Sequence, residues 1–285
     1  MSIQIEDNAT DVLRKSMLGR GISSEMLAEK SGLPLAAIRR LRRERADAEI
    51  CSRVAPALNL CPEKLKRLDA DFDAGVSGSS ANEPCIPESC TRHIMFCGNK
   101  ILPKMTSNAY AWTDLDRGEA VLFDCGMNGE ALVEFLKARE IKDVSLCLTH
   151  RHFDHADGQK ALREAFPQLR IFSFYTLFGE NEETPCERFV EVATLRLRAI
   201  PVPGHTVDSV VFLWENTPAP FPPIAFTGDT LFLGSVGGCL PGHLEHSLSS
   251  IRKQLFEALD PETILLPGHG PATTLRAERE NNPFF

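Results

Sequence analysis

The stretch Thr149-His-Arg-His-Phe-Asp-His155 decides the fold of this chain. It follows the apolar run 144–148, which predicts a buried strand, so metal-binding side chains gather in one loop at a strand end. These side chains are His150, His152, Asp154 and His155. Imidazole and carboxylate groups without thiolate suit zinc, iron or manganese, and a single ion cannot conveniently take so many from one turn. The loop therefore predicts a metal site with a second cation. Exposed polar residues on a turn are the less favoured alternative.

The length and composition are those of an ordinary globular protein. The chain has 285 residues, long enough for about two domains, with 43% hydrophobic and 25% charged residues. The formal net charge of -8 argues against a whole-surface preference for nucleic acid or anionic lipid, although basic residues cluster locally.

The chain offers no membrane or export signal, so we expect a cytoplasmic protein with no membrane partner. No apolar run approaches the roughly 20 residues that span a bilayer, and residues 1–17 are too polar for a signal-peptide core. Nine cysteines, an odd number, fit reduced thiols better than a disulfide framework. Cys85 and Cys90 could form a redox pair or join a second metal site, but free linker thiols are the favoured interpretation.

Residues 1–70 predict a small all-α domain. Ser23 to Gly32 has the pattern of a capped helix and a tight turn, and Pro34 then opens a second helix. This is the spacing of a helix-turn-helix. The stretch 23–45, followed by 54–68, resembles the lambda-repressor-like helix-turn-helix family, and the resemblance implies DNA binding.

The helix that would read DNA bases lacks suitable side chains. Its first positions hold Pro34, Leu35, Ala36 and Ala37, which cannot hydrogen-bond to base edges. Five arginines follow, which could hold phosphates or simply form a solvated face: Arg39, Arg40, Arg42, Arg43 and Arg45. A docking or dimerisation module that makes a homo-oligomer is therefore favoured over a DNA-binding domain.

A flexible linker over 71–91 and an α/β domain over 92–285 complete the predicted organisation. The linker is rich in Gly, Ser, Ala and acidic residues, and about 15 such residues span roughly 20 Å, so the two domains need not hold a fixed orientation. After Arg92, short strand patterns alternate with amphipathic helix patterns.

Three later turns each offer one ligand-type residue after an apolar run. They are 203–206 with His205, 228–230 with Asp229 and 267–270 with His269. The runs before them predict buried strands, and the glycine beside each ligand allows close backbone approach. Strand ends could therefore bring these residues to one rim.

The ordered motifs THRHFDH, PGHT, GDTLF and PGHG resemble the metallo-β-lactamase-fold hydrolases, most closely the hydroxyacylglutathione-hydrolase-like branch. The resemblance implies an α/β fold, a four-layer αβ/βα sandwich. It also implies that His150, His152 and His205 bind one metal, that Asp154, His155 and His269 bind the other, and that Asp229 bridges them. Two divalent cations are expected, with zinc preferred over iron or manganese. The remaining histidines, His93, His243 and His246, are interpreted as residues of the surface or the surroundings of the site.

The ligand set predicts hydrolysis of a small thioester or ester by a metal-bound hydroxide, with Asp154 and Asp229 as catalytic carboxylates. The resemblance does not extend to glutathione as the carrier, because the chain stops soon after His269, where full-length relatives carry a further helical region that holds glutathione, and residues 234–243 differ from the pattern of many relatives. The alternatives are a lactonase, a persulfide-dioxygenase-like enzyme with one iron, and a DNA-binding regulator whose metal domain senses a ligand.

Overall fold

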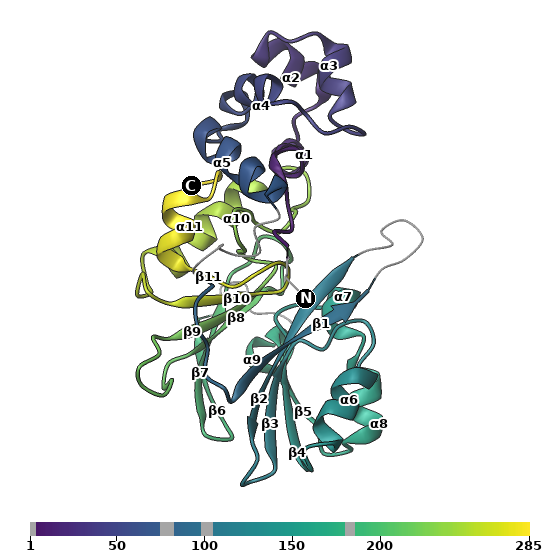
Figure 1. Ribbon diagram of the computed structural model, residues 1–285, viewed down its shortest axis with the longest axis vertical. Coiled ribbons are helices and arrows are strands. Elements are labelled where there is room, and N and C mark those ends of the chain that lie inside the picture. Colours follow the sequence, from purple (N-terminus) through teal and green to yellow (C-terminus); the bar gives the residue numbers. More distant parts are fainter. Residues whose placement is uncertain (1–3, 75–82, 98–104, 180–185) are drawn as a thin grey trace.

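Two β-sheets face each other in the computed structural model, which describes residues 4–74, 83–97, 105–179 and 186–285 (Figure 1). The first sheet has the order β1-β2-β3-β4-β5, and the second has the order β11-β10-β9-β8-β7-β6. The first contains β1 (Cys90–Phe96), β2 (Thr106–Asp114), β3 (Glu119–Phe123), β4 (Asp143–Cys147) and β5 (Arg170–Phe172). The second contains β6 (Arg188–Val192), β7 (Leu195–Pro201), β8 (Val210–Trp214), β9 (Ile224–Gly228), β10 (Ile264–Pro267) and β11 (Thr273–Thr274).

Helices cover the outer face of each sheet. The first sheet carries α6 (Glu130–Lys137) and α8 (Gln159–Ala165), with α7 (Phe153–Ala156) and α9 (Phe174–Phe178) at its strand ends. The second carries α10 (Leu244–Ile251), a π-helical turn (Arg252–Phe256) and α11 (Leu275–Asn281). One apolar core lies between the sheets, where Phe123 stacks on Phe226. Two further cores lie beneath the outer helices, so the predicted α/β four-layer sandwich is confirmed.

Parallel pairing sets where the sandwich presents its loops. Strand β4 pairs in parallel with β3 and β5, and β9 pairs in parallel with β10. The carboxyl ends of parallel neighbours lie at the same edge of a sheet, which is where open α/β folds place their sites. The segments that follow β3, β4, β9 and β10 are therefore brought together.

The N-terminal helices comprise α1 to α5 and one 3-10 turn. They are α1 (Ala9–Gly19), α2 (Ser24–Ser31), α3 (Leu35–Arg40), α4 (Ala48–Val54), the 3-10 turn (Pro56–Leu58) and α5 (Pro62–Asp73). The predicted capped helix is present: the Ser23 side chain accepts from the amide of Met26, and Gly32 ends α2 in the left-handed conformation. Pro34 precedes α3. The helix-turn-helix resemblance and the domain boundaries stay predictions.

The N-terminal helices share an apolar core with the second sheet and its helices. Gly19 lies so close to Leu244 that a Cβ at position 19 would sit 2.8 Å from the Leu244 Cβ. The amide of Cys61 donates to the carbonyl of Pro283 at 3.1 Å, and Arg20 forms an ion pair with Glu245. These contacts fix the orientation of the helices, so the expectation of freely oriented domains is wrong. The composition of a linker predicts the distance that it can span, but it contains no information about which surfaces of the two domains pack together.

The boundaries of the predicted linker differ slightly from the elements. Helix α5 continues to Asp73, and strand β1 begins at Cys90 rather than after Arg92. Residues 75–82, the middle of the predicted linker, lie outside the described residues. None of the helices in the described ranges is long and apolar enough to cross a bilayer.

Glu278 is a buried acid at the junction of α11 with the segment after β9. Its carboxylate accepts from the amide of Gly234 at 2.9 Å, the hydroxyl of Thr273 at 2.8 Å and the amide of Asn282 at 2.9 Å. Burial raises its pKa to about 7 in spite of these donors. The native state therefore binds this proton more tightly than the unfolded chain does.

We expect Glu278→Gln to flatten the pH dependence of stability. A raised carboxyl pKa contributes stability that is complete below the unfolded value of 4.5 and is lost as pH rises to about 7. Between pH 4 and pH 8, wild type should lose on the order of 3 kcal/mol of unfolding free energy that the variant does not lose. Urea titrations across pH 4–8 measure this, and parallel curves for the two proteins would contradict the assignment.

Candidate metal centre

The seven predicted ligand residues lie together in two groups at the ends of the strands. The first group holds His150, His152, His205 and Asp229, and the second holds Asp154, His155 and His269. Within each group the candidate ligand atoms lie within 4.8 Å of one another. The loop after β4 supplies members of both groups, and the segments after β7, β9 and β10 supply one residue each. The structure thus brings together every residue that the sequence nominated, and metal binding by them stays a prediction.

Asp229 lies between the two groups. Its Oδ2 is 3.4 Å from His205 Nε2, in the first group. Its Oδ1 is 3.2 Å from His155 Nε2 and 3.4 Å from His269 Nε2, in the second. Since each oxygen faces a different group, this carboxylate has the geometry of a bridge between two cations.

The second group is compact. Asp154 Oδ2 lies 3.5 Å from His155 Nε2 and 3.4 Å from His269 Nε2, and the two histidine Nε2 atoms are 3.3 Å apart. In the first group, His205 Nε2 and His152 Nδ1 are 2.9 Å apart. Each set of donor atoms thus surrounds a small volume into which one cation fits.

Backbone carbonyls and one acid orient the imidazoles. Nδ1 of His269 donates to the carbonyl of Thr106 at 2.8 Å, and Nδ1 of His205 donates to the carbonyl of Gly238 at 2.7 Å. Nδ1 of His155 lies 2.9 Å from Asp124 Oδ2. Such contacts fix the tautomer that leaves Nε2 free to ligate.

Asp124 is a functional residue that the sequence analysis did not assign. It is buried directly after β3, with a φ of 57°, and it also accepts from the amide and the hydroxyl of Thr149, both at 2.8 Å. It therefore connects the start of the metal loop to His155. An acid directly after the apolar run 119–123 was the available signal, but only the pairing of β3 with β4 shows what it faces.

Two positions near the site require glycine because neighbouring side chains lie too close to the backbone for a Cβ atom. A Cβ at Gly228, where φ is 49°, would lie 2.2 Å from Thr149 Oγ1. A Cβ at Gly268 would lie 2.5 Å from His155 Cε1 and 2.7 Å from Asp229 Oδ1. A larger residue at position 228 would displace Thr149 at the start of the metal loop, and one at position 268 would displace His155 and Asp229, which explains the glycine beside Asp229 and beside His269.

The charges of the site favour the ligating forms. Burial raises the pKa of Asp229, but His269 and His155 outweigh it and hold that pKa well below its usual value. Burial lowers the pKa of His150 well below the ordinary value. Burial also opposes protonation of His155, yet Asp229 and Asp124 raise its pKa to about 10. An ionised carboxylate and a neutral His150 can ligate at once, whereas a cation must compete with a proton at His155.

The residues fit a pair of divalent cations. His150 Nε2 and Asp229 Oδ1 are buried without a hydrogen-bond partner among the described residues, and buried polar atoms rarely lack one. Nitrogen and carboxylate oxygen donors without thiolate suit zinc, iron or manganese. None of the cysteines in the described part of the chain belongs to either group, and Cys85 and Cys90 are both free thiols.

The three remaining histidines lie outside both groups. His243 and His246 are exposed at the start of α10. His93 lies on β1, where its ring contacts Phe135 edge-on at 4.3 Å and its Nε2 is 3.1 Å from the Thr91 hydroxyl. These positions agree with surface residues.

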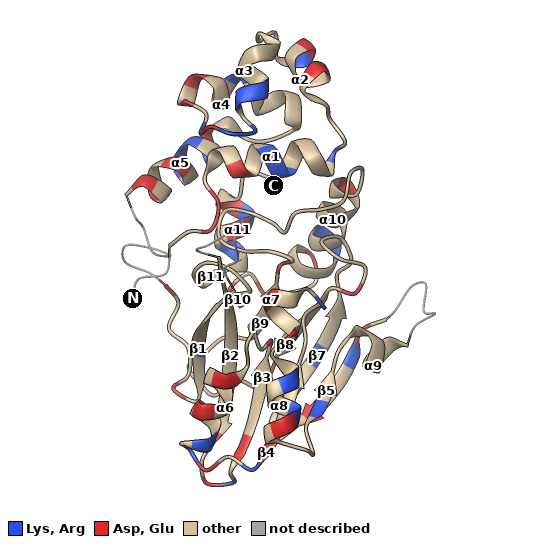
Figure 2. Ribbon diagram, turned by 90° about the vertical axis from the view of Figure 1, so that its right-hand side faces the viewer, with Lys and Arg blue, Asp and Glu red and all other residues tan. Residues whose placement is uncertain are grey.

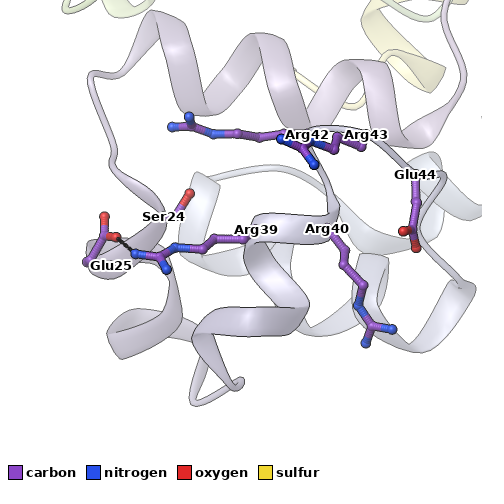
Figure 3. A pocket seen from close by; sticks show the side chains of 7 residues that line it. All are labelled: Ser24, Glu25, Arg39, Arg40, Arg42, Arg43 and Glu44. Carbon is purple, nitrogen blue, oxygen red and sulfur yellow. Dashed lines mark hydrogen bonds and ion pairs between the residues drawn. The ribbon is translucent and has the colours of Figure 1, made fainter.

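Arg39 and Arg40 lie at the end of α3, and Arg42, Arg43 and Arg45 lie in the segment that follows it, among acidic neighbours (Figure 2). A hollow of about 520 Å³ is lined by Ser24, Glu25, Arg39, Arg40, Arg42, Arg43 and Glu44. Figure 3 shows Arg39 directed at Glu25, with which it pairs at 2.8 Å. Arg45 forms ion pairs with Asp69 and Asp73. No side-chain hydrogen bond or ion pair in the described ranges involves Arg40, Arg42 or Arg43.

Comparison with known proteins agrees with this geometry. A family model described as the metallo-beta-lactamase superfamily matches residues 103–170. A protein of Streptococcus pyogenes serotype M6, described as a probable metallo-hydrolase, is 28% identical over 192 residues, which cover 58% of this chain and 80% of that protein. A hydroxyacylglutathione hydrolase of Francisella philomiragia is 30% identical over 152 residues, covering 53% of this chain and 56% of that enzyme. The chain thus spans little more than half of the latter.

A solved structure shares the architecture. The crystal structure of BLEG-1, a B3 metallo-beta-lactamase, superimposes with a TM-score of 0.54 at 27% identity and covers 68% of this chain and 99% of that one. With the two facing sheets, the outer helices and the family match over the loop that carries the first ligands, the chain has the fold of the metallo-β-lactamase superfamily.

Proposed function

We propose that this protein is a binuclear metallohydrolase that cleaves a small thioester or ester. The observation that carries the proposal is the position of Asp229, whose two oxygens face the two ligand groups. A pair of divalent cations, with zinc preferred, would supply Lewis acidity and lower the pKa of a shared water so that hydroxide is available near neutral pH. No serine or cysteine nucleophile is then needed.

The residues of the chain would hold and orient the reacting groups. His150, His152 and His205 would bind one cation, Asp154, His155 and His269 the other, and Asp229 both. Asp154 has its pKa lowered, since His269 and His155 outweigh the effect of burial, so it stays ionised. An ionised Asp154 would accept a hydrogen bond from the attacking water and so orient that water toward the substrate carbonyl.

A thioester or ester is supported by the relatives that act on such bonds. The hydroxyacylglutathione hydrolases with which this chain shares 27–30% identity are named for a thioester substrate, although the chain covers only 56–68% of their length. The proposal therefore names the bond and leaves the acyl carrier open. A lactone is an internal ester and falls under the same chemistry.

An enzyme with one iron, of the persulfide dioxygenase type, is the competing class. Two groups of ligand atoms with a carboxylate between them support two cations rather than one. The two classes separate in one experiment: purified protein with its metal content measured is assayed against acylthioesters, lactones and glutathione persulfide. Thioester or ester turnover with about two metals per chain supports the proposal, and oxygen consumption with one iron overturns it.

Replacing the bridging carboxylate tests the mechanism directly. We expect Asp229→Ala to lose at least one metal per chain and to lower kcat/KM by more than the roughly 10- to 100-fold typical of residues that only support a ligand. Asp157→Ala is the matched control, since Asp157 is an exposed acid directly after α7 and outside both groups. Elemental analysis and steady-state kinetics provide the readouts. Full turnover with both metals retained in Asp229→Ala would refute the bridging role.

Contact with nucleic-acid phosphates is a second candidate function, for the N-terminal helices. One observation favours it: Arg40, Arg42 and Arg43 line an open hollow and have no acidic partner among the described residues. Assembly into a homo-oligomer through these helices remains the alternative prediction. Base reading is not expected, because Pro34 and Ala36 are exposed at the start of α3 and offer no side-chain donors.

Salt dependence distinguishes these possibilities. If the hollow binds phosphates, duplex DNA should bind at about 50 mM salt without sequence preference, and replacing Arg40, Arg42 and Arg43 by Ala should reduce the salt slope by about one per lost contact. A variant with Arg117, Arg163 and Arg170 replaced by Ala removes the same charge from the sandwich and should bind as wild type does. Gel-shift titrations measure both. Equal salt slopes of DNA binding for the two triple variants would exclude phosphate contact by Arg40, Arg42 and Arg43, and homo-oligomer assembly would then be the remaining prediction.

A further inference from the structure

We infer that Lys15 and Asp7 are positioning residues for the metal centre, acting through the loop 229–238. This role rests on the proposed function, because the loop begins at Asp229, the carboxylate that faces both ligand groups. Positioning this loop would be a role of the N-terminal segment and α1 that does not depend on any partner that the N-terminal helices bind.

An ion pair between the half-buried Lys15 and the buried Asp7 connects the N-terminal segment to this loop. Asp7 is only 6% exposed and accepts from Lys15 Nζ at 2.5 Å and from the Ser235 hydroxyl at 2.5 Å. Lys15 Nζ also donates to the carbonyl of Val236 at 3.2 Å and lies 4.6 Å from the centroid of the Phe232 ring. Lys15 and Asp7 thus contact three residues in the middle of the loop.

The far end of the loop contacts two ligand residues. The amide of Gly237 donates to the carbonyl of Asp229 at 2.9 Å, and Nδ1 of His205 donates to the carbonyl of Gly238 at 2.7 Å. A Cβ at Gly237 would lie 2.6 Å from His205 Nδ1, so backbone and imidazole are in tight contact. Because Val236 precedes Gly237, a shift of the tethered segment would move the acceptors and donors that orient Asp229 and His205.

The loop is held from two sides. On the sandwich side, Glu278 accepts from the amide of Gly234, and Asn282 donates to the carbonyl of Ser235 at 3.0 Å. On the other side, α5 places Leu68 where a Cβ at Gly234 would meet its Cδ1 at 2.4 Å, and Lys15 and Asp7 provide the polar contacts. Removing Lys15 leaves the buried Asp7 charge without its cationic partner, and neutralising Asp7 weakens the contacts that it accepts from Lys15 and Ser235, so in both cases the loop segment should rearrange.

The variants Lys15→Met and Asp7→Asn test this role in the full-length protein, with Lys64→Met as the matched control. Lys64 also reaches from the N-terminal helices to the rest of the chain, but its Nζ donates to the carbonyl of Phe285 at 3.1 Å, away from the loop. Two measurements apply: hydrogen exchange of peptides covering 229–238, and zinc retention in a chelator titration. Exchange reports on the backbone of the loop and does not require an active enzyme, and it is compared at equal zinc content.

We expect Lys15→Met and Asp7→Asn to speed exchange in 229–238 by about tenfold and to lower the chelator concentration at half-loss of zinc by about 10-fold, the lower end of the effect typical of residues that support a metal ligand. The double variant should match the single variants, because both remove one shared interaction. Lys64→Met should leave both readouts at their wild-type values. Exchange elsewhere, such as over α6, should not change.

Three results would overturn the inference: loop exchange equal to that of Lys64→Met, zinc retention equal to wild type, or a uniform rise of exchange over the whole chain, which would indicate general destabilisation. Failure of the proposed function has a different signature. Wild-type protein that holds two metals but hydrolyses no thioester or ester would refute the hydrolase proposal, while the exchange and zinc titrations would still decide the role of Lys15 and Asp7.

Discussion

The structure depends on the concentration of imidazole and carboxylate groups at one edge of a two-sheet sandwich. Burial in an apolar fold opposes charge on each of these groups, yet Asp229 keeps its pKa well below the usual value because His269 and His155 face it. The ionised Asp229 therefore depends on its histidine neighbours and could not be buried here alone. The apolar cores on either side of the sheets offset the cost of burying these charged groups, and they fix the strand ends from which the candidate ligands project.

Support for the ligands comes from all parts of the chain. Asp124 and Thr149 connect the first sheet to His155 and His150, and the carbonyl of Thr106 orients His269. The loop 229–238 connects the second sheet to Asp229 and His205, and it is itself contacted by Asp7, Lys15 and Glu278. The N-terminal segment and helix α1 thus contact the loop that supports the site. A domain joined only by a flexible tether would make no such contact.

Much of the site could be predicted because its ligands carry a chemical signal in sequence. His150, His152, Asp154 and His155 are dense within one loop, and His205, Asp229 and His269 each stand beside a glycine after an apolar run. The supporting groups could not be predicted in the same way. Asp124 is one acid among many, and the carbonyls of Thr106 and Gly238 belong to the backbone, which every residue possesses. The prediction that the N-terminal helices orient freely was wrong. The composition of the linker indicates how flexible that segment is, but it does not indicate which surfaces of the two parts pack against each other.

By itself, the sequence determined the alternation of strands and helices and the seven candidate ligands, because apolar periodicity and ligand-type residues are local properties of the chain. The four-layer sandwich was predicted from the resemblance of its ordered motifs to a known family. Only the tertiary structure decided that each oxygen of Asp229 faces a different ligand group, that Asp124 holds His155, and that Asp7 and Lys15 reach the loop after β9. These relations join residues up to 228 positions apart. They arise from strand pairing and helix packing, which no local pattern encodes.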